Sequence, residues 1–196
     1  MLVGIVGRIG AGKSTAAEIF EKYGAYVISA DKIGRDVVEK NPSVLKQLAK
    51  TFGTDILTPA GKLRRRKLGE IAFASDDTKR KLNAIVHPAL LKELDRQVKA
   101  AQKTHTLVVI DAALLIDWGW QKKVDLTVLI HAGVETQTKR LRAKGYDLAE
   151  VRQRLRSQLP YRTLRKQADV AVLNNTTRAK LETKIRRLIS RLAKTV

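Results

Sequence analysis

The chain has 196 residues, a length that fits one domain with small insertions. It contains no cysteine and only three histidines, which excludes a disulfide framework, a thiolate metal site and a cysteine nucleophile. The formal net charge is +20, from 39 Lys and Arg against 19 Asp and Glu. Such a balance attracts anions, but it does not choose among nucleic acid, an anionic membrane surface and a phosphorylated small molecule. Much of it can equally be a solvated surface.

The chain shows no sign of a membrane segment or a leader peptide. No apolar stretch reaches the length of a membrane-spanning helix. The N-terminus lacks the basic start and the small-residue cleavage site of a secretory signal. We therefore expect a cytoplasmic protein with no membrane partner.

Short apolar runs predict five β-strands in the chain. Most of them lack polar alternation, as do strands whose two faces are both covered. Segments with helical spacing lie between them, and this alternation indicates an α/β fold with a mainly parallel sheet. The predicted strands are Leu2–Val6, Ala25–Ser29, Leu107–Asp111, Leu126–Ile130 and Val170–Leu173.

Two segments do not belong to the simple alternation. The stretch between the second and third strands is far longer than one crossover helix needs, and we interpret residues 32–100 as a helical insertion. Its long helix is predicted to begin near Ser75, with Asp76 and Asp77 in the first turn. The segment 139–166 holds ten Lys or Arg residues and is predicted to form two helices that join near Gly145 and end at Pro160.

The C-terminal run from Thr176 to Lys194 predicts one basic amphipathic helix, capped by Thr176 or Asn175. Its apolar residues recur at helical spacing and should face the core. They are Leu181, Ile185, Leu188 and Leu192.

The residues from Gly7 to Ser14 match the pattern G-x-x-x-x-G-K-[ST] of a phosphate-binding loop. The glycines allow backbone amides to approach phosphate closely, Lys13 reaches the β and γ phosphates, and the hydroxyl of Ser14 can bind Mg²⁺. The loop follows an apolar strand and precedes a helical pattern, as the motif requires, so a glycine-rich turn without a ligand is the weaker interpretation. The predicted nucleotide-binding residues are Gly7, Gly10, Ala11, Gly12, Lys13, Ser14 and Thr15.

Two carboxylates follow predicted strands at the edge of the sheet where the loop lies. Asp111 ends the third strand, where a metal-organising carboxylate of a phosphoryl-transfer enzyme is found. Asp31 comes just after the second strand and could orient an acceptor hydroxyl and take its proton. Either could instead cap a helix, but beside a phosphate-binding loop we favour the functional interpretation.

The basic segment 139–166 is predicted to be a lid that closes over the transferring phosphate. Closure would exclude water and place positive charge near developing negative charge. The alternative is a solvated helical face. The candidate residues are Arg140, Arg142, Arg152 and Arg156.

The chain resembles the dephospho-CoA kinase family over nearly its whole length. After the P-loop, the order and spacing of several short motifs carry this resemblance. They are Ser29-Ala30-Asp31-Lys32-Ile33, Leu63–Leu68 with Phe73, Leu82–Pro88 with its His87-Pro88, Asp111–Leu115, Gln158, Ala168-Asp169 and Asn174-Asn175. The sequence departs from the family pattern at Ser29, Arg64, Ala113, Asp117 and Lys144.

The resemblance implies a three-layer P-loop fold with a five-stranded sheet, and ATP-dependent phosphorylation of the ribose 3′-hydroxyl of dephospho-coenzyme A. ATP and Mg²⁺ are the implied cofactors, with Ser14 and Asp111 at the metal. The catalytic residues would be Asp31 as the base, Lys13 and Arg140, and Arg142 would contact ATP. The implied substrate-binding residues are Asp31, Arg65, His87 and Leu114, although a histidine before proline can equally be structural.

The implied domain organisation has three parts. The nucleotide-binding core would comprise residues 1–31, 101–138 and 167–196. The insertion 32–100 would bind dephospho-CoA, and 139–166 would form the lid. We expect a monomer or a weak homo-oligomer with no specific nucleic-acid partner.

Two other functions stay open on the sequence alone. One is a P-loop kinase of another small acceptor, such as a nucleoside monophosphate. The other is a basic P-loop protein that binds nucleic acid, against which stand the few aromatic residues and the lack of a helix-turn-helix or RNA-binding signature.

Overall fold

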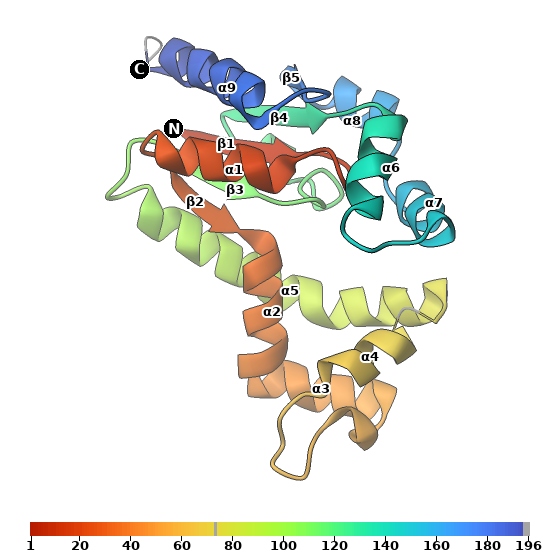
Figure 1. Cartoon of the computed structure of the whole chain (residues 1–196). Coiled ribbons are helices and arrows are strands. Elements are labelled where there is room, and N and C mark those ends of the chain that lie inside the picture. The colour runs from red at the N-terminus through yellow and green to blue at the C-terminus, as the bar shows by residue number, and fades with distance from the viewer. Residues whose placement is uncertain (73, 194–196) are drawn as a thin grey trace. The chain divides into compact units, whose positions relative to one another are not determined.

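The protein contains a parallel β-sheet of five strands (Figure 1), seen in a computed structural model that describes residues 1–72 and 74–193. The strand order is β2-β3-β1-β4-β5, and β1 pairs in parallel with both β3 and β4. The strands are β1 Leu2–Val6, β2 Tyr26–Ser29, β3 Val108–Asp111, β4 Leu126–His131 and β5 Val170–Leu173. Each predicted strand is confirmed to within one residue, and so is the α/β fold.

The chain forms two compact units. One consists of Met1–Ile28 together with the chain from Ala100 onward, and the other is Ser29–Lys99. The first unit holds the P-loop, and the second consists mainly of helices. The predicted division into core, insertion and lid stays a prediction about function.

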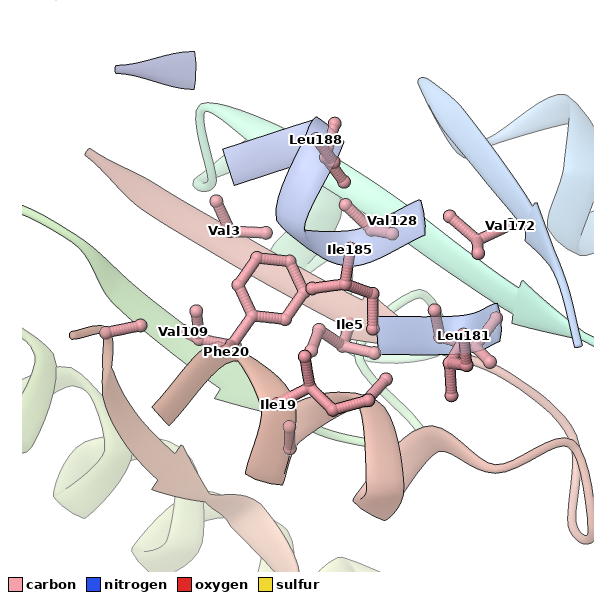
Figure 2. Close-up of a cluster of buried hydrophobic side chains, with 14 residues drawn as sticks. Val3, Ile5, Ile19, Phe20, Val109, Val128, Val172, Leu181, Ile185 and Leu188 are labelled. Carbon is pink, nitrogen blue, oxygen red and sulfur yellow. The ribbon is translucent and has the colours of Figure 1, made fainter. Parts of the chain in front are cut away.

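The main core of the first unit lies between the sheet and the helices α1 (Lys13–Lys22) and α9 (Arg178–Leu192). Figure 2 shows Phe20 of α1 and Ile185 of α9 directed toward Ile5 of β1, and all three side chains are fully buried. The predicted apolar face of α9 is confirmed, because Leu181, Ile185 and Leu188 are buried and Leu192 packs against them.

The cap of α9 differs from the prediction by one or two residues. Thr177 is the N-cap, and its Oγ1 accepts a hydrogen bond from the Lys180 amide at 3.4 Å. Asn175 instead accepts a hydrogen bond from the Gly133 amide at 2.8 Å, which ties two loops together. Lys194, the predicted end of this helix, lies outside the described residues.

The basic segment forms three helices where two were predicted. They are α6 Val134–Arg142, α7 Leu148–Arg156 and α8 Tyr161–Lys166. Pro160 does not end the helical segment but begins α8 as its N-cap, with φ −60° and ψ 150°. Proline fits this N-cap position because a φ of −60° is the value its ring fixes, and an N-cap residue needs no N–H of its own for the helix. Leu141, Val151 and Leu155 form a small core between α6 and α7, and Ile9 of the P-loop packs against it.

The second unit is built from α2 Ala30–Lys40, α3 Pro42–Phe52, the short 3₁₀ turn η1 Thr54–Ile56, α4 Arg65–Ala72 and most of α5 Asp76–Ala101. Its buried residues include Ile33, Leu48, Leu68 and Leu94, one from each long helix. The predicted start of the long helix is confirmed to within one residue, and Pro88 lies inside it. A second 3₁₀ turn, η2 Trp120–Lys122, lies between β3 and β4 of the first unit.

Over the ranges that the structure describes, no helix combines the length and the apolar character needed to cross a lipid bilayer.

Candidate functional site

The predicted phosphate-binding loop connects the carboxyl end of β1 to the first turn of α1. Gly10 and Gly12 have φ values of 76° and 92°, in the left-handed region that side chains other than glycine resist. A Cβ on Gly10 would lie 3.0 Å from the carbonyl oxygen of Gln137 in α6. The glycine pattern is therefore required both by backbone conformation and by close approach.

The N-terminus of α1 is open to an anion. No side chain caps it, and its first turn contains no acidic residue. The first amides of a helix have no partner within the helix, and the helix dipole favours negative charge at this end. An oxyanion is the ligand that such a helix end accepts best.

Lys13 and Asp111 meet beside this helix end. β1 pairs with β3 so that Ile5 lies opposite Asp111, which places Asp111 at the predicted edge of the sheet. The Lys13 Nζ donates a hydrogen bond to Asp111 Oδ1, and the two side chains are only 14% and 12% exposed. A buried ammonium beside a carboxylate needs that partner until an anionic ligand replaces it.

The oxygen atoms near the loop are of the kind that Mg²⁺ binds. They are the hydroxyl of Ser14, which is exposed in the first turn of α1, and the carboxylate of Asp111. Among the described residues there is no cluster of three or more His, Asp or Glu that could hold a metal ion. Mg²⁺ usually takes one or two protein oxygens and completes its shell with water and substrate phosphates, so this small donor set fits it.

Arg140 of α6 lies against the P-loop. Its Nη1 donates hydrogen bonds to the carbonyl oxygens of Gly10 and Ala11 at 3.2 and 3.4 Å, and its Nη2 reaches the carbonyl of Thr176 at 3.4 Å. The predicted catalytic Arg140 is thus next to the nucleotide loop, where it holds backbone carbonyl groups. Its contact with a transferring phosphate stays a prediction.

The other predicted lid arginines do not reach the loop in the same way. Arg142 ends α6, and Arg152 and Arg156 lie on α7; all three are exposed. The link from α7 to the P-loop is made from the loop side instead. Arg8 Nη2 donates to the carbonyl of Leu155, and the Ile9 amide donates to Gln158 Oε1 at 2.8 Å.

Leu114 lines a small pocket in the unit that holds the P-loop. The pocket has a volume of about 230 Å³ and lies beside Gly7 and Arg8, with Gln158 on its wall. Leu114 is 37% exposed, so part of its side chain is accessible to a ligand in this pocket. Its predicted contact with substrate stays a prediction.

A second pocket of about 340 Å³ lies between β4, α6 and α8. His131 and Tyr161 form part of its wall, with ring centres 4.9 Å apart. Partial burial lowers the pKa of His131, and the nearby charges of Lys184 and Arg165 lower it further. No predicted site residue lines this pocket.

The remaining predicted site residues belong to the second unit. Asp31 is exposed in the first turn of α2, and Ser29 rather than Asp31 caps that helix. Arg65 begins α4, and its Nε pairs with Glu39 of α2. His87 is half-buried in α5 directly before Pro88.

Asn174, for which the sequence analysis predicts no role, is only 4% exposed and touches the P-loop. In the sequence it stands out only as part of the Asn174-Asn175 motif of the family. The signal that could have found it is an asparagine pair directly after a strand, at the edge where the P-loop lies.

The comparisons with known proteins cover nearly the whole chain. A family model described as Dephospho-CoA kinase matches residues 1–180. A dephospho-CoA kinase of Corynebacterium glutamicum is 38% identical over 192 residues, which is 97% of this chain and 96% of the relative.

Two solved structures share the fold. A protein of Thermus thermophilus has a TM-score of 0.81 and 28% identity, covering 98% of this chain and 97% of its own. A dephospho-CoA kinase from Campylobacter jejuni has a TM-score of 0.76 and 23% identity, covering 99% and 98%.

Proposed function

The chain belongs to the dephospho-CoA kinase family, and we propose how its residues carry out the reaction of that family. Enzymes of this family phosphorylate dephospho-coenzyme A with ATP in coenzyme A biosynthesis. The resemblance inferred from the sequence motifs is thereby confirmed, and so is the interpretation of the protein as a phosphotransferase. The observation that carries the proposal is the P-loop, whose uncapped helix end lies beside the Lys13–Asp111 pair.

ATP binds with its phosphates at the P-loop amides. The amides of the loop and of the first turn of α1 surround the β and γ phosphates, with Gly7, Gly10, Ala11, Gly12, Ser14 and Thr15 forming the cradle. Lys13 leaves Asp111 and bonds to the phosphates, because their negative charge exceeds that of one carboxylate. Arg140 and Arg142 add positive charge on the α6 side.

Mg²⁺ would be held by the hydroxyl of Ser14 and, through water, by Asp111 once Lys13 has moved. When bound, the ion neutralises charge on the phosphate oxygens.

Asp31 acts as the base toward the acceptor. Its carboxylate accepts a hydrogen bond from the ribose 3′-hydroxyl and takes its proton as the hydroxyl oxygen bonds to the γ-phosphorus. The bond from that phosphorus to the bridging oxygen breaks, and ADP leaves with the electron pair. Arg65, His87 and Leu114 bind dephospho-CoA, with the helical unit supplying most of the contacts.

The substrate is a small molecule, and no specific nucleic acid or membrane is needed as a partner. We further propose that the protein acts in the cytoplasm as a monomer or a weak homo-oligomer. The net charge of +20 then serves to attract two anionic substrates.

The test is a coupled ADP-release assay with Mg-ATP and either dephospho-CoA or a nucleoside monophosphate as acceptor. The Asp31→Asn variant should lose about 10²–10⁴-fold in kcat, the range for removing a general base. The matched control is Asp36→Asn, a partly exposed carboxylate of the same helix that pairs with Lys40, and it should keep wild-type activity.

Turnover with a nucleoside monophosphate but not with dephospho-CoA would refute the substrate assignment. Equal activity of the Asp31→Asn and Asp36→Asn variants would refute the role of Asp31 as the base, but it would not affect the assignment of dephospho-CoA as the substrate.

A further inference from the structure

Asn174 is one of the few buried polar side chains in the described part of the protein. It directly follows β5, and its backbone amide donates to the carbonyl of His131 at 2.7 Å, which fixes its position beside β4. Its side-chain Nδ2 donates to the carbonyl oxygen of Ala11 in the P-loop at 2.9 Å. The buried side-chain amide of Asn174 thus donates its hydrogen bond to one backbone carbonyl of the P-loop.

The orientation of the Asn174 amide is set by a second contact. Its Oδ1 lies 3.5 Å from Nη2 of Arg140, and Arg140 Nη1 approaches the same Ala11 carbonyl at 3.4 Å. A guanidinium only donates hydrogen bonds, so the oxygen of the asparagine must face Arg140 and the nitrogen must face Ala11. Asn174 and Arg140 therefore both donate to the Ala11 carbonyl and contact each other.

Holding this carbonyl also directs an amide. The carbonyl of Ala11 and the N–H of Gly12 belong to one peptide group, and no peptide bond in the described chain is cis. In a planar trans peptide these two groups point in opposite directions. The N–H of Gly12 must then point away from Asn174, and Gly12 is the residue that precedes the open end of α1.

The close approach of Asn174 leaves little conformational freedom at Gly12. Gly12 has φ 92°, and a Cβ placed on it would collide with the Asn174 amide. If the Ala11 carbonyl lost the closer of its two donors, Asn174, only the longer contact from Arg140 would hold it, and the peptide could rotate because glycine tolerates both signs of φ. The Gly12 N–H would then lose its fixed direction.

We propose that Asn174 is a positioning residue of the ATP site: it holds the Ala11–Gly12 peptide so that the Gly12 N–H is directed at a bound phosphate group. This rests on the proposed binding of ATP at the P-loop. Asn174 itself touches no substrate, and its effect passes through the loop. The value of a preorganised donor lies in needing no reorganisation when the ligand arrives.

The test compares Asn174→Ala and Asn174→Asp with two variants of the exposed neighbour, Asn175→Ala and Asn175→Asp. The alanine pair removes an amide at each position, and the aspartate pair adds the same negative charge near the phosphates. Asn174→Asp also turns the donor toward Ala11 into an acceptor. The readouts are KM for Mg-ATP, KM for dephospho-CoA, the Kd of inorganic tripolyphosphate, and urea unfolding.

The expected result is a rise of about tenfold in KM for Mg-ATP and in the tripolyphosphate Kd for both Asn174 variants, equal to about 1.4 kcal/mol. KM for dephospho-CoA should stay within about twofold, because the ordering concerns only the phosphate cradle. The Asn175 variants should change the tripolyphosphate Kd less than the matching Asn174 variants.

Two outcomes would overturn the proposal. One is a fall in unfolding free energy with unchanged tripolyphosphate affinity, which would make Asn174 a structural residue only. The other is an equal loss in Asn174→Asp and Asn175→Asp with none in Asn174→Ala, which would be a charge effect. Because tripolyphosphate needs no acceptor, a wild-type protein inactive on dephospho-CoA would refute the proposed reaction without deciding this result.

Discussion

Replacing Gly10 by alanine should impair both stability and ATP binding, and Gly24 offers a matched control that should lose stability alone. Both glycines have positive φ, 76° and 91°, but a Cβ on Gly24 meets nothing within 4 Å. Alanine in the left-handed region costs about 1–2 kcal/mol. Alanine also lowers the conformational entropy of the unfolded chain, which stabilises the fold by about 0.4–1 kcal/mol. The net loss of unfolding free energy in Gly24→Ala should therefore be about 1 kcal/mol.

In Gly10→Ala the added methyl group would also make a close steric contact. Its Cβ would lie 3.0 Å from the Gln137 carbonyl oxygen and 3.2 Å from the Gln137 Cα, both backbone atoms of α6. The loop or the helix must shift, and such overpacking costs about 1–3 kcal/mol. Because the shift moves the phosphate cradle, we expect the Kd for ATP to rise about tenfold, while Gly24→Ala leaves it unchanged.

The measurements are urea unfolding and isothermal titration with Mg-ATP on both variants. If the two variants lose the same unfolding free energy and both bind ATP as the wild type does, the close approach of α6 to the P-loop does not constrain the site, and the reasoning from the Cβ contact is refuted.

Three further predictions concern the helices. Thr177→Ala should cost about 1 kcal/mol of unfolding free energy by removing the α9 cap, and Thr176→Ala should cost almost nothing; equal losses in urea unfolding would contradict the cap assignment. Ile185→Ala should cost about 2–5 kcal/mol in the same assay, because this fully buried side chain fills the core between α9 and the sheet; a smaller loss would mean that the core closes around the gap. Hydrogen bonds from Arg96 and Gln97 lower the pKa of Glu93 from 4.5 to about 2, so this carboxylate stabilises the fold above about pH 4.5, and its contribution is lost as the pH falls toward 2. The penalty of Glu93→Gln in urea unfolding should therefore be larger at pH 7 than at pH 3, and a pH-independent penalty would exclude this linkage.

The strands and the P-loop were predictable because their signals are local. Five apolar runs fixed five strands to within one residue, and the spacing of Gly7, Gly12 and Lys13 placed the phosphate cradle between β1 and α1. The placement of Asp111 near the P-loop followed from a rule of topology, since the carboxyl ends of parallel strands share one edge. Its ion pair with Lys13 was not predicted.

The failures occurred where local chemistry allowed several outcomes. The prediction that Pro160 ends the helical segment is wrong, because proline fits a helix start equally well and α8 begins directly after it. Asn175 and Thr176 are acceptable caps, but Asn175 is engaged by the Gly133 amide and the helix starts one residue later, after Thr177.

Contacts between residues far apart in the chain could not be predicted from local sequence patterns. Arg140 was expected to face the transferring phosphate, and nothing in its surroundings along the chain shows that its guanidinium contacts the carbonyls of Gly10 and Ala11. The burial of Asn174 is likewise a product of tertiary packing.

The way the P-loop is held has a consequence for how the protein is made. The loop lies near the start of the chain, but its backbone partners are Arg140, Gln158 and Asn174. β1 also lies in the middle of the sheet, and Val3 pairs with Leu126 of β4. During synthesis the first strand and its loop leave the ribosome long before these partners exist, and such distant pairings form slowly. Affinity for nucleotide should therefore arise late, after β5 has joined the sheet, and ATP should bind neither a truncated nascent chain nor an early refolding intermediate.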